Sequence, residues 1–155
     1  MSRISAIPEG HHTAAPYLCT RDAARALEFY RQAFGAVEVM RIAMPDGKIG
    51  HAEITIGDSL IMIADEFPEH NRSPQTLGGT TVMIHLYVED VDALASRAVA
   101  AGATLAVPVS DQFYGDRSGR LIDPFGHVWV VASHIEDVTV AEMRRRLAAM
   151  AGGDR

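Results

Sequence analysis

Hydrophobic and polar positions in residues 13–64 predict the order strand, helix and three strands. Residues 13–19 form a short extended run. Residues 23–34 place apolar side chains on one helical stripe, which predicts an amphipathic helix of three turns. Asp22 stands at the N-cap position of this helix, and Gly35 stands where a left-handed residue ends helices.

Three strands are predicted after this helix. Residues 37–44 alternate in hydrophobicity, and residues 49–56 alternate again after the pair Asp46-Gly47. Because Asp-Gly favours a tight two-residue turn, these two segments are predicted to form a β-hairpin. Gly57-Asp58 makes the next turn, and residues 59–64 form the third strand.

The same order begins again after residues 67–80, which are rich in turn-forming residues and are predicted to be a connector. A strand at 81–88 precedes a helix that starts at Asp90 and ends at Gly102, and extended segments follow at 104–109 and 128–132. Between those segments we expect a polar loop over residues 111–119. A capping box at Thr139 and Glu142 then predicts a last helix, over residues 139–150.

The two halves are related by one constant shift. Tyr17 matches His85, and residues 60–63 match residues 128–131, when the first half is moved by 68 positions. A constant shift over this span indicates a structural repeat. The sequence therefore predicts two βαβββ modules, at 13–66 and 81–134, in one α+β domain with a C-terminal helix.

Charge and cysteine content exclude several classes of function. The net charge is -6, and the basic residues form no stripe apart from Arg144–Arg146, so neither nucleic acid nor a membrane is an expected partner. Cys19 is the single cysteine, which excludes an internal disulfide and favours a reducing compartment. There is no signal-peptide pattern at the start and no apolar run of about 20 residues. We expect a cytoplasmic protein.

Three segments resemble the vicinal oxygen chelate superfamily, which comprises glyoxalases, bleomycin resistance proteins and extradiol dioxygenases. They are residues 21–35, 87–92 and 123–127, and the strings at 49–53 and 111–116 are similar to a bacterial glyoxalase-like subgroup. The resemblance implies curled mixed sheets around a cavity, and pairing into homodimers. The connector is long enough for the two modules to pair within one chain or to exchange between two chains, so the sequence leaves both arrangements open.

The resemblance also implies where a metal would bind. Metal-dependent members take one ligand from the first strand and one from the last strand of each module. The matching positions in this sequence are Ala15, Met62, Met83 and Val130. Aliphatic side chains and thioethers are not ligands for the divalent ions concerned, so we predict no metal and no other cofactor.

Three residues are candidates for acid–base catalysis. His51 and Glu53 lie two apart on a predicted strand and therefore point to one face, as a proton-carrying pair, part of a relocated metal site or a pair that satisfies itself at a sheet edge. His85 shares the face of Met83 that the family turns toward its cavity, although a core histidine bound to a neighbour would show the same pattern.

Further side chains are predicted to bind a ligand. In the polar loop, Asp116 and Arg117 either orient a polar ligand or pair with each other to hold the loop. The full predicted ligand-binding set is Tyr17, Met62, Met83, His85, Phe113, Tyr114, Asp116 and Arg117.

Three functions remain open from the sequence. The first is a binding protein that holds a small organic molecule in a metal-free cavity, for which methionines are suited as adaptable apolar walls. The second is a glyoxalase-like lyase or isomerase that acts on a carbonyl compound through His51, Glu53 or His85, or through a relocated metal. The third is a structural or regulatory dimer.

Overall fold

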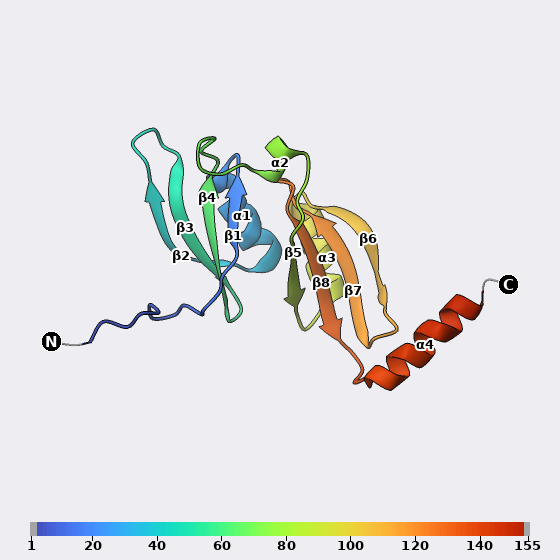
Figure 1. The fold of residues 1–155 in the computed structure, drawn as a ribbon. Coiled ribbons are helices and arrows are strands. Elements are labelled where there is room, and N and C mark those ends of the chain that lie inside the picture. Colours follow the sequence, from blue (N-terminus) through green and yellow to red (C-terminus); the bar gives the residue numbers. More distant parts are fainter. Residues whose placement is uncertain (1–2, 154–155) are drawn as a thin grey trace. The chain divides into compact units, whose positions relative to one another are not determined.

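A computed structural model describes residues 3–153 and divides them into two compact units. Unit 1 contains the residues up to Thr81 together with Pro124–His127, and unit 2 contains Val82–Asp123 together with the residues from Val128 onward. Each unit has one four-stranded sheet and its own helices (Figure 1).

Unit 1 is a mixed sheet with the strand order β1-β4-β3-β2. β1 pairs with β4 in parallel, and the other neighbours are antiparallel. Helix α1 lies against one face of this sheet, and the face turned away from α1 is here called the open face (Figure 1). The elements are β1 (Tyr17–Thr20), α1 (Ala23–Phe34), β2 (Val37–Ala43), β3 (Ile49–Ile56), β4 (Ser59–Asp65) and α2 (Pro74–Leu77).

Unit 2 repeats this topology with the order β5-β8-β7-β6, in which β5 and β8 are parallel. Helix α3 packs against this sheet, and α4 follows the last strand. The elements are β5 (Met83–Tyr87), α3 (Val91–Ala101), β6 (Thr104–Asp111), β7 (Asp116–Ile122), β8 (Val128–His134) and α4 (Val140–Gly152). The α+β class, the two βαβββ modules and the C-terminal helix are therefore confirmed.

The strand registers obey the shift of 68 residues. Tyr17 pairs with Met62 between β1 and β4, and His85 pairs with Val130 between β5 and β8. Both members of the second pair lie 68 positions after those of the first. The repeat found in the sequence therefore corresponds to a repeated strand pairing, with the same hydrogen-bonded register in both units.

The last strand of each module also caps the module's helix. The Asp65 carboxylate accepts a hydrogen bond from Ala23 N at 2.8 Å, at the start of α1. The hydroxyl of Ser133 accepts one from Val91 N at 3.0 Å, at the start of α3. Both residues of the second contact again lie 68 positions later. Free N–H groups at helix starts need such acceptors, so the contact fixes each helix on its sheet.

The core of unit 1 includes a turn from the second half of the chain. Phe125 is 4% exposed, and its ring centroid lies 6.2 Å from that of Phe29 and 6.4 Å from that of Tyr30 on α1. Edge-to-face packing of this kind stabilises buried aromatic rings.

Two sequence expectations were wrong. The connector is not free of regular structure, because Pro74–Leu77 forms the short helix α2, with Ser73 as its N-cap. The polar loop is shorter than residues 111–119, because Asp116–Ile122 is strand β7. Its polar side chains suggested a loop, but the strand pairs on both edges. Within the described residues, no helix has the length and apolarity that crossing a membrane requires.

Candidate functional site

The open face of the unit 1 sheet carries the candidate residues of the first module. Side chains alternate along strands, and register partners share a face. Leu18 and Ile63 are buried and point toward α1, so Tyr17 and its register partner Met62 point to the open side. Glu53 is paired with Met62 and lies on that same face.

A row of polar groups crosses this face. The Tyr17 hydroxyl lies 2.7 Å from Nδ1 of His51, and Nε2 of His51 lies 3.7 Å from the Glu53 carboxylate. His11 completes the row with Nε2 at 3.0 Å from the same carboxylate oxygen. We call these four residues the polar row. Glu53 is 7% exposed, so its charge is largely shielded from solvent.

Both ring nitrogens of His11 face acceptor atoms. Its Nδ1 faces the backbone carbonyl of Glu9 at 3.1 Å, while Nε2 faces Glu53. Because both partners accept hydrogen bonds, they favour the form of His11 in which both ring nitrogens carry a proton. The Glu9 carbonyl and then the Glu53 carboxylate raise the pKa of His11 above its usual value. Burial, followed by the nearby negative charge of Glu53, raises the pKa of the Tyr17 phenol.

His11 is the functional candidate that sequence reasoning missed. It lies before β1, in a segment whose sequence has no periodicity. No local pattern could have found it, because its partner Glu53 is 42 residues away.

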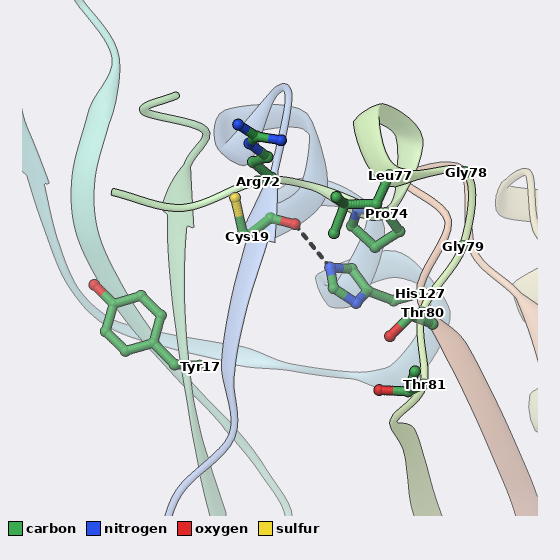
Figure 2. Close-up of a pocket in the computed structure, with 10 residues that line it drawn as sticks. All are labelled: Tyr17, Cys19, Arg72, Pro74, Leu77, Gly78, Gly79, Thr80, Thr81 and His127. Carbon is green, nitrogen blue, oxygen red and sulfur yellow. Dashed lines mark hydrogen bonds between the residues drawn. The ribbon is translucent and has the colours of Figure 1, made fainter. Parts of the chain in front are cut away.

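Two cavities flank strand β1 within unit 1, and both include Tyr17 and Cys19. The first, here called the sheet-side cavity, has a volume of about 490 Å³. Its walls are Tyr17, Cys19, Gly50, Ala64, Phe67, His70 and Asn71. The second, here called the connector-side cavity, has a volume of about 510 Å³ (Figure 2). Its walls are Tyr17, Cys19, Arg72, Pro74, Leu77, Gly78, Gly79, Thr80, Thr81 and His127.

The Cys19 thiol, which lines both cavities, is in an environment that lowers its reactivity. Burial, followed by the negative charges of Glu66 and Asp65, raises the pKa of Cys19 to about 11. The thiolate is the reactive form of cysteine. At physiological pH, Cys19 is therefore largely an uncharged and unreactive thiol that lines both cavities.

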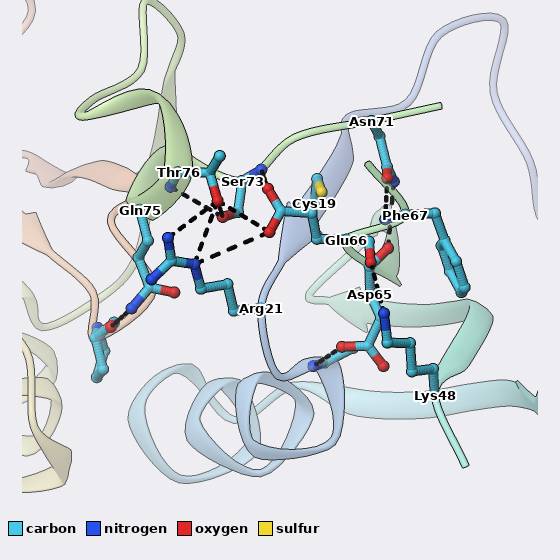
Figure 3. Close-up of polar contacts among 12 residues, drawn as sticks. Cys19, Arg21, Lys48, Asp65, Glu66, Phe67, Asn71, Ser73, Gln75 and Thr76 are labelled. Carbon is cyan, nitrogen blue, oxygen red and sulfur yellow. Dashed lines mark hydrogen bonds and ion pairs between the residues drawn. The ribbon is translucent and has the colours of Figure 1, made fainter. Parts of the chain in front are cut away.

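Polar contacts fix the conformation of the connector, residues 67–80, which lines part of both cavities (Figure 3). Glu66 accepts hydrogen bonds from Ser73 N at 2.8 Å and from the Thr76 hydroxyl at 2.9 Å. Arg21 donates to the same hydroxyl at 3.1 Å. Phe67 N donates to the Asn71 side chain at 2.6 Å. The walls are therefore fixed by contacts inside unit 1.

The open face of unit 2 carries a second polar group. His85 is exposed, and its ring centroid lies 4.6 Å from that of Tyr87. The Tyr87 hydroxyl donates to Asp116 at 2.8 Å. Asp116 is 4% exposed, and its carboxylate lies 2.8 Å from Nδ1 of His134. Asp137 and then Asp116 raise the pKa of His134. His85 is thus a surface residue and not a core histidine.

The remaining loop candidates are engaged within unit 2. Arg117 does not pair with Asp116: it pairs with Asp92 at 2.8 Å and with Asp111 at 2.9 Å. The rings of Phe113 and Tyr114 meet edge to face at 5.3 Å, and the Tyr114 hydroxyl lies 3.4 Å from that of Ser118. Arg117 and Tyr114 therefore support the loop and strand that carry them.

The structure brings some predicted residues together within each unit. Tyr17, His51, Glu53 and Met62 share the open face of unit 1. The others lie in unit 2, namely Met83, His85, Phe113, Tyr114, Asp116 and Arg117. A single site built from both sets stays a prediction.

The four family metal positions do not fit a metal. Met62 and Val130 stand beside Tyr17 and His85 in the parallel pairs, and neither thioether nor aliphatic side chains suit a divalent ion. Among residues 3–153, no group of three or more His, Cys, Asp or Glu side chains is arranged to hold a metal ion.

Comparisons with known proteins agree with this fold. The family model "Glyoxalase/Bleomycin resistance protein/Dioxygenase superfamily" matches residues 10–131. The chain is similar to the uncharacterised Mycobacterium bovis protein Mb0911c, with 41% identity over 143 residues that cover 90% of this chain and 94% of that protein.

Solved structures show the same likeness. The crystal structure of TioX from Micromonospora sp. ML1 has a TM-score of 0.65 and 28% identity, and the match covers 81% of this chain and 100% of that one. The fosfomycin resistance protein FosX of Listeria monocytogenes has a TM-score of 0.63 at 18% identity, covering 85% of this chain and 97% of that one, and supports the fold alone.

Proposed function

The chain belongs to the glyoxalase/bleomycin resistance protein/dioxygenase superfamily, and from this premise we propose that it binds a small organic molecule without a metal ion. The observation that carries the proposal is the sheet-side cavity of about 490 Å³. Binding pockets for small molecules have volumes of roughly 300–1,000 Å³. The cavity lies at the open face of β1 and β4, where the family positions Ala15 and Met62 offer no metal ligand.

The chemistry of this cavity suits a partly apolar ligand. Tyr17 and Phe67 provide aromatic surface, and Ala64 leaves room beside them. His70 and Asn71 add polar groups that would orient a ligand. Because few polar groups stand among apolar walls, we expect a planar or amphipathic compound.

A screen of planar organic compounds by thermal shift tests this proposal. Compounds that raise the melting temperature are then titrated by isothermal calorimetry against Tyr17→Leu, which removes an aromatic wall. We expect Tyr17→Leu to weaken binding about tenfold, the loss typical of one good aromatic contact. Val39→Ala is the matched control, because Val39 is 55% exposed on β2 and lines neither cavity. Equal losses in the two variants would contradict the proposed location.

The polar row favours a second candidate function. Tyr17 and His51 are hydrogen-bonded at 2.7 Å, and Glu53 lies next to His51, so these residues could exchange a proton with a carbonyl compound. The corresponding reaction would be a lyase or isomerase step. The enzyme would remove a proton from the carbon next to the carbonyl and return it elsewhere on the substrate.

Exchange of that proton tests the second candidate. Carbonyl compounds incubated with the protein in deuterated water would take up deuterium, measured by NMR. His51→Asn is expected to abolish uptake while Kd stays within about threefold, because the side chain carries the proton but provides little of the binding surface. Unchanged uptake in His51→Asn would eliminate this candidate and leave binding as the function.

A further inference from the structure

The residues that line the connector-side cavity carry a positive charge, although the whole chain is negatively charged. The chain has a net charge of -6, yet no Asp or Glu lines this cavity. Its one formally charged wall residue is Arg72. By contrast, the small cavity of about 40 Å³ between α1 and β2 is lined by Glu28 and Glu38 together with two arginines. A cavity with a cation and no acid attracts anions.

Arg72 differs from its basic neighbours because the fold does not engage its side chain. Arg21 donates to the Thr76 hydroxyl and lies 3.9 Å from Glu66. Lys48 donates to the Glu66 carbonyl at 3.2 Å. The Arg72 guanidinium has no hydrogen bond or ion pair with any described residue. Its donors are therefore available to a ligand.

The other walls complete a site for an amphipathic anion. Thr80 and Thr81 line the far wall, and their hydroxyls point toward β1 (Figure 2). Pro74 and Leu77 contribute apolar surface, and Leu77 is 63% exposed.

The other titratable side chains that line this cavity are Tyr17, Cys19 and His127, and none of them is an anion at neutral pH. Nε2 of His127 donates to the Cys19 carbonyl at 2.8 Å. The Cys19 thiol stays uncharged at neutral pH because its pKa is raised to about 11. The residues that line the cavity therefore include a cation, Arg72, and no acid to oppose it.

We propose that the connector-side cavity binds the carboxylate of a small organic acid, with Arg72 as its ion-pair partner and the apolar body of the acid against Leu77 and Tyr17. A guanidinium presents paired N–H groups that match a carboxylate in two hydrogen bonds. The inference goes beyond the proposed function, because it adds a site in a second cavity and names the class of ligand that this site takes.

Matched probes test the inference on the full chain. 2-Naphthoate carries a carboxylate, and 2-naphthamide has the same shape without the charge. Equilibrium dialysis is expected to show naphthoate binding about tenfold more tightly than naphthamide, as a charge-assisted pair predicts. Arg72→Gln should remove that difference, and Arg72→Lys should restore part of it. Arg25→Gln is the matched control, since Arg25 is exposed on α1 and lines no described cavity.

Three outcomes would overturn the inference. Equal affinities of the two probes for the wild type would reject the carboxylate site and leave small-molecule binding standing. An equal loss in Arg25→Gln and Arg72→Gln would show only the effect of net charge. Failure of both probes to bind would reject this site and leave the proposed function, which rests on the sheet-side cavity, standing.

Discussion

At the scale of single residues, Cys19 shows how environment decides reactivity. Its thiol lines two cavities, so its position alone would suggest a reactive group. Burial and two nearby carboxylates raise its pKa from 9.0 to about 11, so little thiolate is present at neutral pH. Access and reactivity are separate properties at this residue.

We therefore expect slow alkylation of the folded protein. A rise of two pKa units lowers the thiolate fraction at pH 8 about 100-fold, so reaction with iodoacetamide should slow by about that factor. Intact-mass spectrometry gives the rate without ambiguity because Cys19 is the only cysteine. The chain unfolded in urea is the control. A folded rate within threefold of the unfolded rate would contradict the prediction.

His11 provides a second prediction at this scale. Glu53→Gln removes a negative charge, so the pKa of His11 should fall, measured by NMR titration of its ring protons. The fall should be partial because the Glu9 carbonyl, the larger cause of the raised pKa, remains. An unchanged pKa would show that the contact between His11 and Glu53 is absent in solution.

The same contact predicts a pH dependence. A group whose pKa is raised by folding stabilises the folded state below its unfolded pKa. The attachment of His11 to the sheet should thus be fully present below about pH 6.5 and lost as the pH rises through the raised pKa. Hydrogen exchange of the segment before β1, compared between pH 5.5 and pH 8, measures this loss. Glu53→Gln should make the two pH values more alike.

At the scale of elements, prediction succeeded where the signal was local. Helix α1 and strand β3 begin and end where capping residues and the Asp-Gly turn placed them. Strand β7 was missed because its first residues are Asp116 and Arg117, polar residues that resemble a loop. Their partners lie on other elements, as with Tyr87 for Asp116, and a local pattern does not contain that information.

Asp65 supports a prediction about how elements join. It is 6% exposed and accepts from Ala23 N at 2.8 Å and Ile49 N at 2.6 Å, so it ties α1 and β3 to β4. Asp65→Ala leaves two buried donors unpaired and should lower the free energy of unfolding by about 3 kcal/mol.

The N-cap of α1 is the control for this substitution. Asp22→Ala removes one exposed contact, to Arg25 N, and should cost about 1 kcal/mol. Urea denaturation measures both variants. Equal losses would show that Asp65 acts as a local cap and does not join three elements.

At the scale of the whole molecule, the repeat was predictable and much of the site was not. The shift of 68 residues can be recognised in the sequence. It correctly placed Tyr17 and His85 at equivalent positions on β1 and β5. The cavities could not be predicted because α2 and residues 78–81 form a wall of the connector-side cavity, and turn-forming residues give no sign of what they enclose.

The repeat also underlies a prediction about metals. The family draws two ligands from each module, and the repeat places the four positions at Ala15, Met62, Met83 and Val130. A missing ligand in one module would leave a weakened site, but here both modules lack ligands together. Manganese, iron(II), nickel and zinc should therefore leave the melting temperature within about 1 °C of the metal-free value, because only binding to the folded state raises it.

Elemental analysis of untagged protein is the independent measurement. One equivalent of metal per chain, together with a rise in melting temperature, would contradict the prediction and direct attention to His51, Glu53 and His85 as replacement ligands. Substituting each of the three would then be decisive, because a catalytic zinc site usually needs three protein ligands and loses affinity when one is removed. Without binding, these residues remain candidates for proton transfer or ligand contact, and of these two roles only proton transfer predicts a bell-shaped dependence of rate on pH.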